Sequence, residues 1–213
     1  MLAYHDNPQL KALVLAGIEE HRKADRLVRG RYWEDGKGCA VGCTLETIRQ
    51  IEGLKRIDHE DHALYERYMG VPRFLARIED GLFERLPTEH AMAWPARFAA
   101  AIRPGADLAL VHSRFLHWLL VDPAEGVARF ARTDRTRTAI ERVGALYARR
   151  LAGDEPSTKA WADAAAAAYA ADAAAAIANA DAAAYAAAAA AARQSQREKL
   201  RELLPTMFLE ASP

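Results

Sequence analysis

Hydrophobic residues recur every three or four positions along most of this chain, which is the spacing of helices that pack on a core. Leu10 and Val14 lie on one such face near the N-terminus. Asn7-Pro8 offers a capping side chain followed by a first-turn proline, and Gly30 follows the last periodic position, which predicts a helix between them. No alternating pattern of apolar and polar residues indicates a strand, so the chain is expected to be all-α.

Further helices are expected along the chain, each introduced by a residue that can cap or open a helix. The same apolar spacing follows each of these starts, and residues 107–121 are apolar enough to belong to the core. The expected starts are Thr44, Asp58, Val71-Pro72, Asp107 and Asp122-Pro123.

The segment from Ala160 to Ala192 is alanine at 25 of its 33 positions and contains neither glycine nor proline. Alanine has the highest helix propensity, so one unbroken helix of about 50 Å is predicted. Its bulky residues recur every eight positions and therefore spiral by roughly 80° per step. They are Trp161, Tyr169, Ile177 and Tyr185. A central helix with neighbours on several sides and a projecting helix that docks a partner both remain open.

A polar hinge from Gly153 to Ser157 separates ordinary globular composition from the alanine-rich tract. The predicted organisation is a helical globular region at 1–153 and a long alanine-rich helix with a C-terminal tail at 154–213. One alanine-rich helix cannot make a core alone, so we expect it to pack on the first region as one compact multi-helix domain.

Charge and composition exclude several classes of protein. Lys plus Arg and Asp plus Glu each total 29, giving a formal net charge of zero, whereas general nucleic-acid binders show a basic excess. The start of the chain lacks the pattern of a secretory signal, and the aspartates in the alanine tract argue against a membrane span. Two cysteines do not make a disulfide framework, so a cytoplasmic protein is expected.

The most unusual short segment runs from Trp33 to Cys43 and holds three glycines, a lysine and both cysteines. Glycine permits backbone geometries closed to other residues and close approach of a ligand. A thiol near the helix start expected at Thr44 would have a lowered pKa, while the alternative is a tight turn over two buried cysteines. The candidate ligand-binding residues are Trp33, Gly36, Lys37, Gly38, Cys39, Gly42, Cys43 and His62.

A zinc site is the alternative chemistry for this region. Cys39 and Cys43 are four residues apart, His59 and His62 are three apart, and four such groups could hold zinc tetrahedrally. The spacing matches no standard zinc finger, and the histidines lie among acidic residues, so neither a metal nor a cofactor is predicted. The sequence around Lys37 also lacks the strand and helix context of a phosphate-binding loop. No catalytic residues can be assigned from residue order.

The cysteine loop resembles a family of uncharacterised phage and prophage proteins. Its members share a helical start, a Trp-x-x-Gly-Lys-Gly-Cys-Ala-Val-Gly-Cys loop and often an alanine-rich C-terminal helix. The matching residues here are Trp33, Gly36, Lys37, Gly38, Cys39, Ala40, Val41, Gly42 and Cys43, followed by Asp61-His62, Tyr65-Glu66 and Val71-Pro72. The resemblance implies a mobile-element origin and no particular reaction.

Two functions remain open on this basis. The first is a noncatalytic helical protein-interaction module of phage or mobile-element origin, such as an inhibitor of a host factor or an immunity-type protein. It would have a protein partner, homo-oligomers are allowed, and membrane or nucleic-acid binding is not expected. The alternative is a cysteine-dependent enzyme or small-ligand-binding protein that uses Lys37, Cys39, Cys43 and His62.

Overall fold

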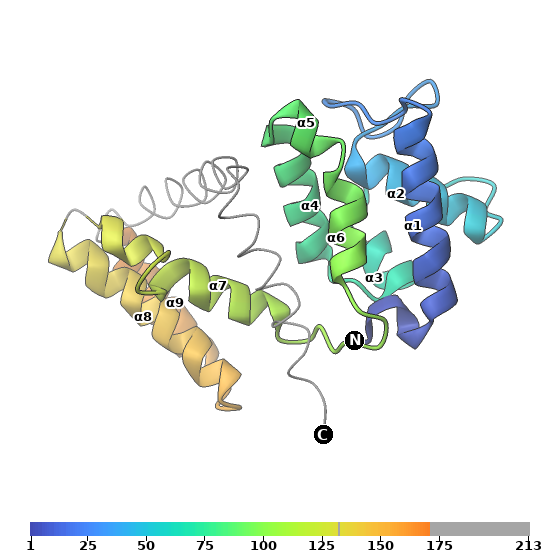
Figure 1. Cartoon of the computed structure of the whole chain (residues 1–213). Coiled ribbons are helices and arrows are strands. Elements are labelled where there is room, and N and C mark those ends of the chain that lie inside the picture. The colour runs from blue at the N-terminus through green and yellow to red at the C-terminus, as the bar shows by residue number, and fades with distance from the viewer. Residues whose placement is uncertain (132, 171–213) are drawn as a thin grey trace. The chain divides into compact units, whose positions relative to one another are not determined.

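The computed structural model describes residues 1–131 and 133–170 (Figure 1). These residues form helices joined by turns and loops, with isolated bridges in place of strands, which confirms the all-α fold. The predicted alanine-rich helix is represented by α9 (Thr158–Ala170), and the remainder of that tract lies outside the described residues. Within the described part, no helix is long and apolar enough to cross a membrane.

The described residues fall into two compact units, one of Met1–Ala109 and one that begins at Leu110. The first unit contains η1 (Ala3–Asp6), α1 (Pro8–Lys23), α2 (Ala40–Ile51), α3 (Leu64–Met69), α4 (Arg73–Arg85), α5 (Thr88–Ala91) and α6 (Trp94–Ala101). The second contains α7 (Val111–Val121), η2 (Val127–Phe130), α8 (Asp134–Leu151) and α9. The predicted division into 1–153 and 154–213 stays a prediction, because most of the second segment lies outside the described residues.

Helix α1 begins where the sequence predicts and ends earlier. The Asn7 side chain accepts hydrogen bonds from the backbone N–H groups of Gln9 and Leu10, with Pro8 as the first helical residue. The helix stops at Lys23, so the predicted end at Gly30 was wrong.

Helix α1 ends at Lys23 because the backbone groups that follow it form hydrogen bonds within the loop and do not continue the helix. The N–H of Val28 donates to the carbonyl of Gly38 at 2.9 Å, and the N–H of Gly38 donates to the carbonyl of Arg26 at 2.9 Å. These bonds hold residues 26–28 against the other end of the loop and take them out of the helical path. The loop at residues 24–38 therefore leaves α1 and returns to the start of α2.

Helices α1 and α2 cross closely because Gly17 has no side chain. A Cβ at Gly17 would lie 2.2 Å from the Cγ2 atom of Thr47. Around this crossing the first unit buries a core drawn from most of its helices. Its largest fully buried apolar side chains are those of Tyr4, Val14, Ile18, Leu45, Ile48, Tyr65, Phe83, Ile102 and Leu108.

Helix α4 begins as the sequence predicts. Gly70 ends α3 with a φ of +60°, a left-handed conformation that glycine adopts without strain. Pro72 precedes the first turn of α4, and the Glu66 carboxylate accepts a hydrogen bond at 2.8 Å from the N–H of Arg73. Leu75 and other apolar residues of α4 are buried in the core. The more polar face of α4 therefore points toward the loop at residues 24–38, and Asp80 and Glu84 on that face accept hydrogen bonds from the loop.

The three helix starts expected at aspartates were wrong. Asp58 and Asp122 accept bonds from backbone N–H groups two residues on, as turn-forming aspartates do, and no helix begins at either. Asp107 makes the same kind of bond to Ala109, and the apolar helix begins later, at Val111. In each case the short side chain closes a turn on its own backbone.

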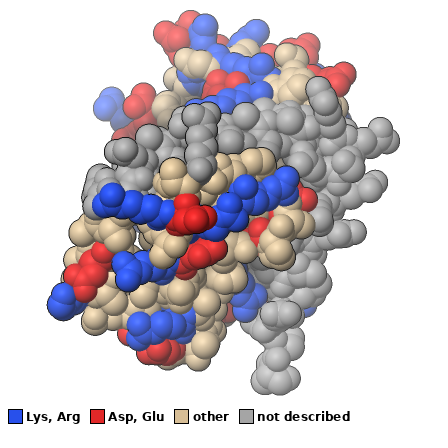
Figure 2. Space-filling model, turned by 90° about the vertical axis from the view of Figure 1, so that its left-hand side faces the viewer, with Lys and Arg blue, Asp and Glu red and all other residues tan. Residues whose placement is uncertain are grey.

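The second unit is built on the contact between α7 and α8. Leu120 and Ile140 lie in its core, and a Cβ at Gly144 would be 2.4 Å from a methyl group of Val121. Helix α9 packs on α8, where the Trp161 and Tyr147 rings lie 4.8 Å apart between centroids, and its Ala164 and Ala168 are buried. On the surface seen in Figure 2, Lys and Arg side chains lie among Asp and Glu side chains.

Candidate functional site

Cys39 ends the loop at residues 24–38 and caps the N-terminus of α2. Its backbone is extended, and its Sγ accepts a hydrogen bond from the N–H of Gly42 at 3.5 Å. Sulfur therefore fills a role that usually falls to the side-chain oxygen of Ser, Thr, Asp or Asn. The helix begins at Ala40, so the predicted start at Thr44 was wrong.

Gly38 and Gly42, on either side of this cap, allow the backbone of Tyr32 to pack directly against them. A Cβ at Gly42 would lie 1.5 Å from the carbonyl oxygen of Tyr32, and one at Gly38 would lie 1.9 Å from it. The loop can lie directly on the first turn of α2 only because both positions lack side chains. Gly36 differs, since it sits in an exposed turn beside Lys37 with a φ of +76° and open space around it.

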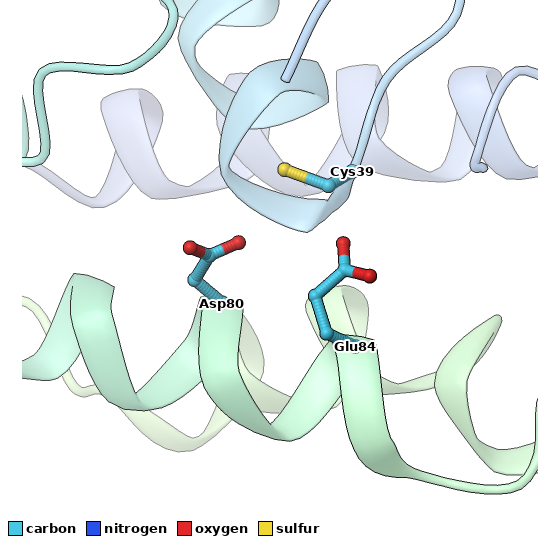
Figure 3. A group of neighbouring side chains, drawn as sticks. All are labelled: Cys39, Asp80 and Glu84. Carbon is cyan, nitrogen blue, oxygen red and sulfur yellow. The ribbon is translucent and has the colours of Figure 1, made fainter. Parts of the chain in front are cut away.

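Two carboxylates on α4 face the Cys39 thiol. Asp80 and Glu84 are one helical turn apart, so both side chains project from the same side of α4. Figure 3 shows them pointing toward Cys39 at the start of α2. Ligand atoms of the three residues all lie within 4.8 Å of one another. We call these three residues the Cys39–Asp80–Glu84 cluster.

Asp80 is held in place by two neighbours that are not part of the cluster. The Tyr32 hydroxyl donates to Oδ2 of Asp80 at 3.1 Å, and Nε2 of His62 lies 3.2 Å from the same oxygen. The rings of Tyr32 and His62 also meet edge to face, with centroids 5.7 Å apart. Both groups fix the orientation of the carboxylate that faces Cys39.

Glu84 is held by the loop rather than by a side chain. The N–H of Gly30 donates to both carboxylate oxygens, at 3.2 and 3.1 Å. The loop at residues 24–38 therefore contacts both carboxylates, through Gly30 and through Tyr32, before it reaches Cys39.

The electrostatics around Asp80 favour neutral or positively charged groups. Burial raises the pKa of Glu84, and the charge of Asp80 raises it further. Burial and then the Asp80 carboxylate raise the pKa of Tyr32 to about 12. A negative charge opposes ionisation of neighbouring acids and attracts cations.

Cys39 responds to the same environment. Burial raises the pKa of its thiol most strongly, and the neighbouring Asp80 carboxylate raises it further. The N–H groups of Gly42 and Val41 act in the opposite direction without outweighing burial. Of the two alternatives that the sequence offered, the structure favours two buried cysteines over a thiol with a lowered pKa, because desolvation of the thiolate dominates.

Cys43 is not part of the cluster. Its Sγ lies 3.4 Å from the carbonyl oxygen of Gly38 and 3.8 Å from that of Arg26, and burial raises its pKa to about 12. His59 pairs with Glu46 at 3.2 Å. Among the described residues, the structure thus does not bring Cys39, Cys43, His59 and His62 together as zinc ligands, and it groups Cys39 with Asp80 and Glu84 instead.

Trp33 anchors the loop at residues 24–38 through two histidine rings. Its ring stacks on His59 with centroids 5.5 Å apart and meets the edge of His21 at 5.3 Å. Burial would raise the pKa of Glu46, but hydrogen bonds from Arg49, Gln50 and His59 outweigh it and lower that pKa to about 2. His59 is therefore anchored to an ionised carboxylate on one side and to Trp33 on the other.

Glu79, the neighbour of Asp80 in the sequence, points into the core. The Tyr65 hydroxyl donates to its Oε2 at 2.7 Å, and Oε1 has no hydrogen-bond partner among the described residues. Burial raises the pKa of Glu79 to about 8, which keeps the side chain protonated at neutral pH. Adjacent residues of α4 thus face opposite environments.

The sequence-predicted candidates divide into three groups. Cys39 and His62 lie at the cluster, while Gly38, Gly42 and Trp33 shape the loop beside it. Gly36 and Lys37 lie in the exposed turn, and the Cys43 sulfur contacts the backbone carbonyl of Gly38. Sequence reasoning missed Tyr32, Asp80 and Glu84, for which the one available signal was the four-residue spacing of the two carboxylates.

Comparisons of this chain with protein-family models, with curated proteins and with solved structures give no match. The function of the site is therefore inferred from the chemistry of its own residues.

Proposed function

We propose that this protein binds a divalent cation at the Cys39–Asp80–Glu84 cluster. The observation that carries the proposal is the convergence of one thiol and two carboxylates within 4.8 Å of one another. Sulfur and carboxylate oxygen are both established protein ligands of divalent metals. The three groups come from two different helices, so a cation between them would also join α2 to α4.

Charge supports the proposal independently of ligand type. Two carboxylates one turn apart repel each other, and the raised pKa of Glu84 includes the effect of Asp80. A divalent cation would remove this repulsion and replace it with attraction. Neighbouring acids would then ionise more readily, because a bound cation reverses the local effect on their pKa.

The surroundings of Asp80 resemble the supporting layer of a metal site. Ligand carboxylates are usually oriented by hydrogen bonds from residues that do not touch the metal. Tyr32 and His62 bond to Oδ2 of Asp80 in this way, and Gly30 bonds to Glu84. Three protein ligands also leave coordination positions for water or for a further ligand.

The cation-binding proposal affects the cysteine-enzyme hypothesis and the protein-interaction hypothesis in different ways. A cysteine nucleophile is disfavoured, because burial raises the pKa of both Cys39 and Cys43. The protein-interaction hypothesis depends on the alanine-rich tract, most of which lies outside the described residues, so it stays a prediction. The phage or mobile-element origin likewise rests on the resemblance of the cysteine loop alone.

Isothermal titration of the reduced full-length chain with zinc tests the proposal. We expect about one ion per chain, and an Asp80→Asn, Glu84→Gln double variant should lose binding because it keeps the side-chain shapes and removes the charges. Glu89→Gln is the matched control, since Glu89 is an exposed acid of the same unit outside the cluster. Equal zinc binding by the wild type and the double variant would refute the proposal.

A further inference from the structure

We propose that Cys39 binds the cation as a thiolate, which makes the site selective for thiophilic divalent metals of the zinc class over magnesium and calcium. This inference rests on the proposed function and names the class of cation that the site takes. Cys39 is then the residue that determines specificity, while the two carboxylates supply most of the attraction for any divalent ion.

The number and kind of ligand atoms in the cluster favour zinc-class metals. Calcium takes about six to eight oxygen ligands, and magnesium keeps several waters in an octahedral shell. The cluster supplies two carboxylates that already accept hydrogen bonds, and its third member is sulfur. Thiolate is a ligand that selects zinc and other soft or borderline metals.

The position of the Cys39 sulfur also suits a thiolate ligand. Cys39 is buried, with 1% of its surface exposed. It caps the N-terminus of α2, where the first backbone N–H groups of the helix point outward. The N–H of Gly42 already donates to Sγ, and the helix N-terminus favours negative charge there. A thiolate held by a cation would keep this hydrogen bond, so the cap of α2 survives metal binding.

Binding exchanges a proton for a metal ion without any change of oxidation state. The S–H bond of Cys39 breaks, its proton leaves to the buffer, and a bond between sulfur and the metal forms as the metal loses a water ligand. Before binding, the neutral thiol and two carboxylates carry a charge of minus two, and afterwards the thiolate, carboxylates and divalent cation carry minus one. Because cysteine binds a metal as the thiolate, about one proton per ion should be released at neutral pH.

Cys43 provides a control within the same helix. It is the only other cysteine of the chain, and it is as fully buried as Cys39. Its sulfur contacts the carbonyl oxygens of Gly38 and Arg26 rather than a carboxylate. If the sulfur–metal bond remains when Cys43 is replaced and is lost when Cys39 is replaced, the metal ligand is the Sγ atom of Cys39.

The test is titration of the reduced full-length chain with cobalt(II), a spectroscopic substitute for zinc, with absorption and proton release recorded together. We expect a near-ultraviolet sulfur-to-cobalt charge-transfer band, release of about one proton per ion, and displacement of cobalt by zinc. Cys43→Ser should keep the band and the proton release. Cys39→Ser should lose both while its circular dichroism spectrum stays unchanged.

The outcomes separate this inference from the proposed function. Cobalt binding without the band or the proton release would overturn thiolate ligation and leave the carboxylate cation site standing. Displacement of cobalt by magnesium or calcium at equal concentration would overturn the assigned selectivity, as would a band that persists in Cys39→Ser. Failure of the wild type to bind cobalt or zinc at all would overturn both proposals.

Discussion

Replacing the buried Glu79 with glutamine should change how the stability of the first unit depends on pH. The pKa of Glu79 is about 8 in the fold against an ordinary value of 4.5, a difference of about 3.5. Since the folded value is raised, the favourable contribution is fully present below pH 4.5 and is lost as pH rises to 8. At about 1.36 kcal/mol per unit, the loss is on the order of 5 kcal/mol for this fully buried group.

Glu79→Gln removes the ionisation and keeps an oxygen to accept the Tyr65 hydroxyl bond. At pH 5 the variant should be about 1–3 kcal/mol less stable, because its amide N–H₂ replaces Oε1, which lacks a partner. At pH 8.5 the variant should be the more stable protein. Urea unfolding of both chains from pH 5 to 8.5, followed by tryptophan fluorescence, gives the difference directly.

The difference between variant and wild type isolates Glu79 from every other group that titrates in this range. Glu89→Gln, an exposed acid of the same unit, should follow the wild type at each pH. A stability difference between Glu79→Gln and the wild type that stays constant from pH 5 to 8.5 would refute the assignment of a protonated buried carboxyl.

Three further predictions follow from local geometry. Gly42→Ala should lower the melting temperature far more than Gly36→Ala, because its Cβ would lie 1.5 Å from the Tyr32 carbonyl while Gly36 faces open space, and equal thermal shifts would contradict this. Ala164→Leu should cost about 1–3 kcal/mol in chemical unfolding by overpacking at a buried position, whereas the exposed Ala165→Leu should be nearly neutral. Tyr32→Phe should weaken zinc binding about 10–100-fold in titration calorimetry by freeing Asp80, and unchanged affinity would show that the hydroxyl does not orient the carboxylate.

Local signals in the sequence predict much of this fold. Asn7-Pro8 and Val71-Pro72 mark helix starts through backbone chemistry that needs no distant partner, and the structure confirms both. The predictions at Gly30 and Thr44 were wrong for a tertiary reason. The loop between α1 and α2 bonds to itself and lies on Gly38 and Gly42, and these contacts decide where each helix stops and starts.

The candidate site could be predicted only in part, for the same reason. Cys39 and His62 were candidates because thiol and imidazole are chemically distinctive wherever they occur. Asp80 and Glu84 are ordinary on a charged helix, and only the packing of α4 against α2 and its loop brings them to the thiol. The sequence spacing of Cys39 and Cys43 suggested a shared site, but the helix turns the second sulfur toward backbone carbonyls.

X-ray absorption at the zinc edge of the zinc-loaded full-length chain tests the central claim most directly. The account predicts one sulfur neighbour at about 2.3 Å together with oxygen neighbours at about 2.0–2.2 Å. The sulfur signal should vanish in Cys39→Ser and remain in Cys43→Ser. A coordination shell without sulfur, or one that Asp80→Asn with Glu84→Gln leaves unchanged, would contradict a cation site at Cys39, Asp80 and Glu84.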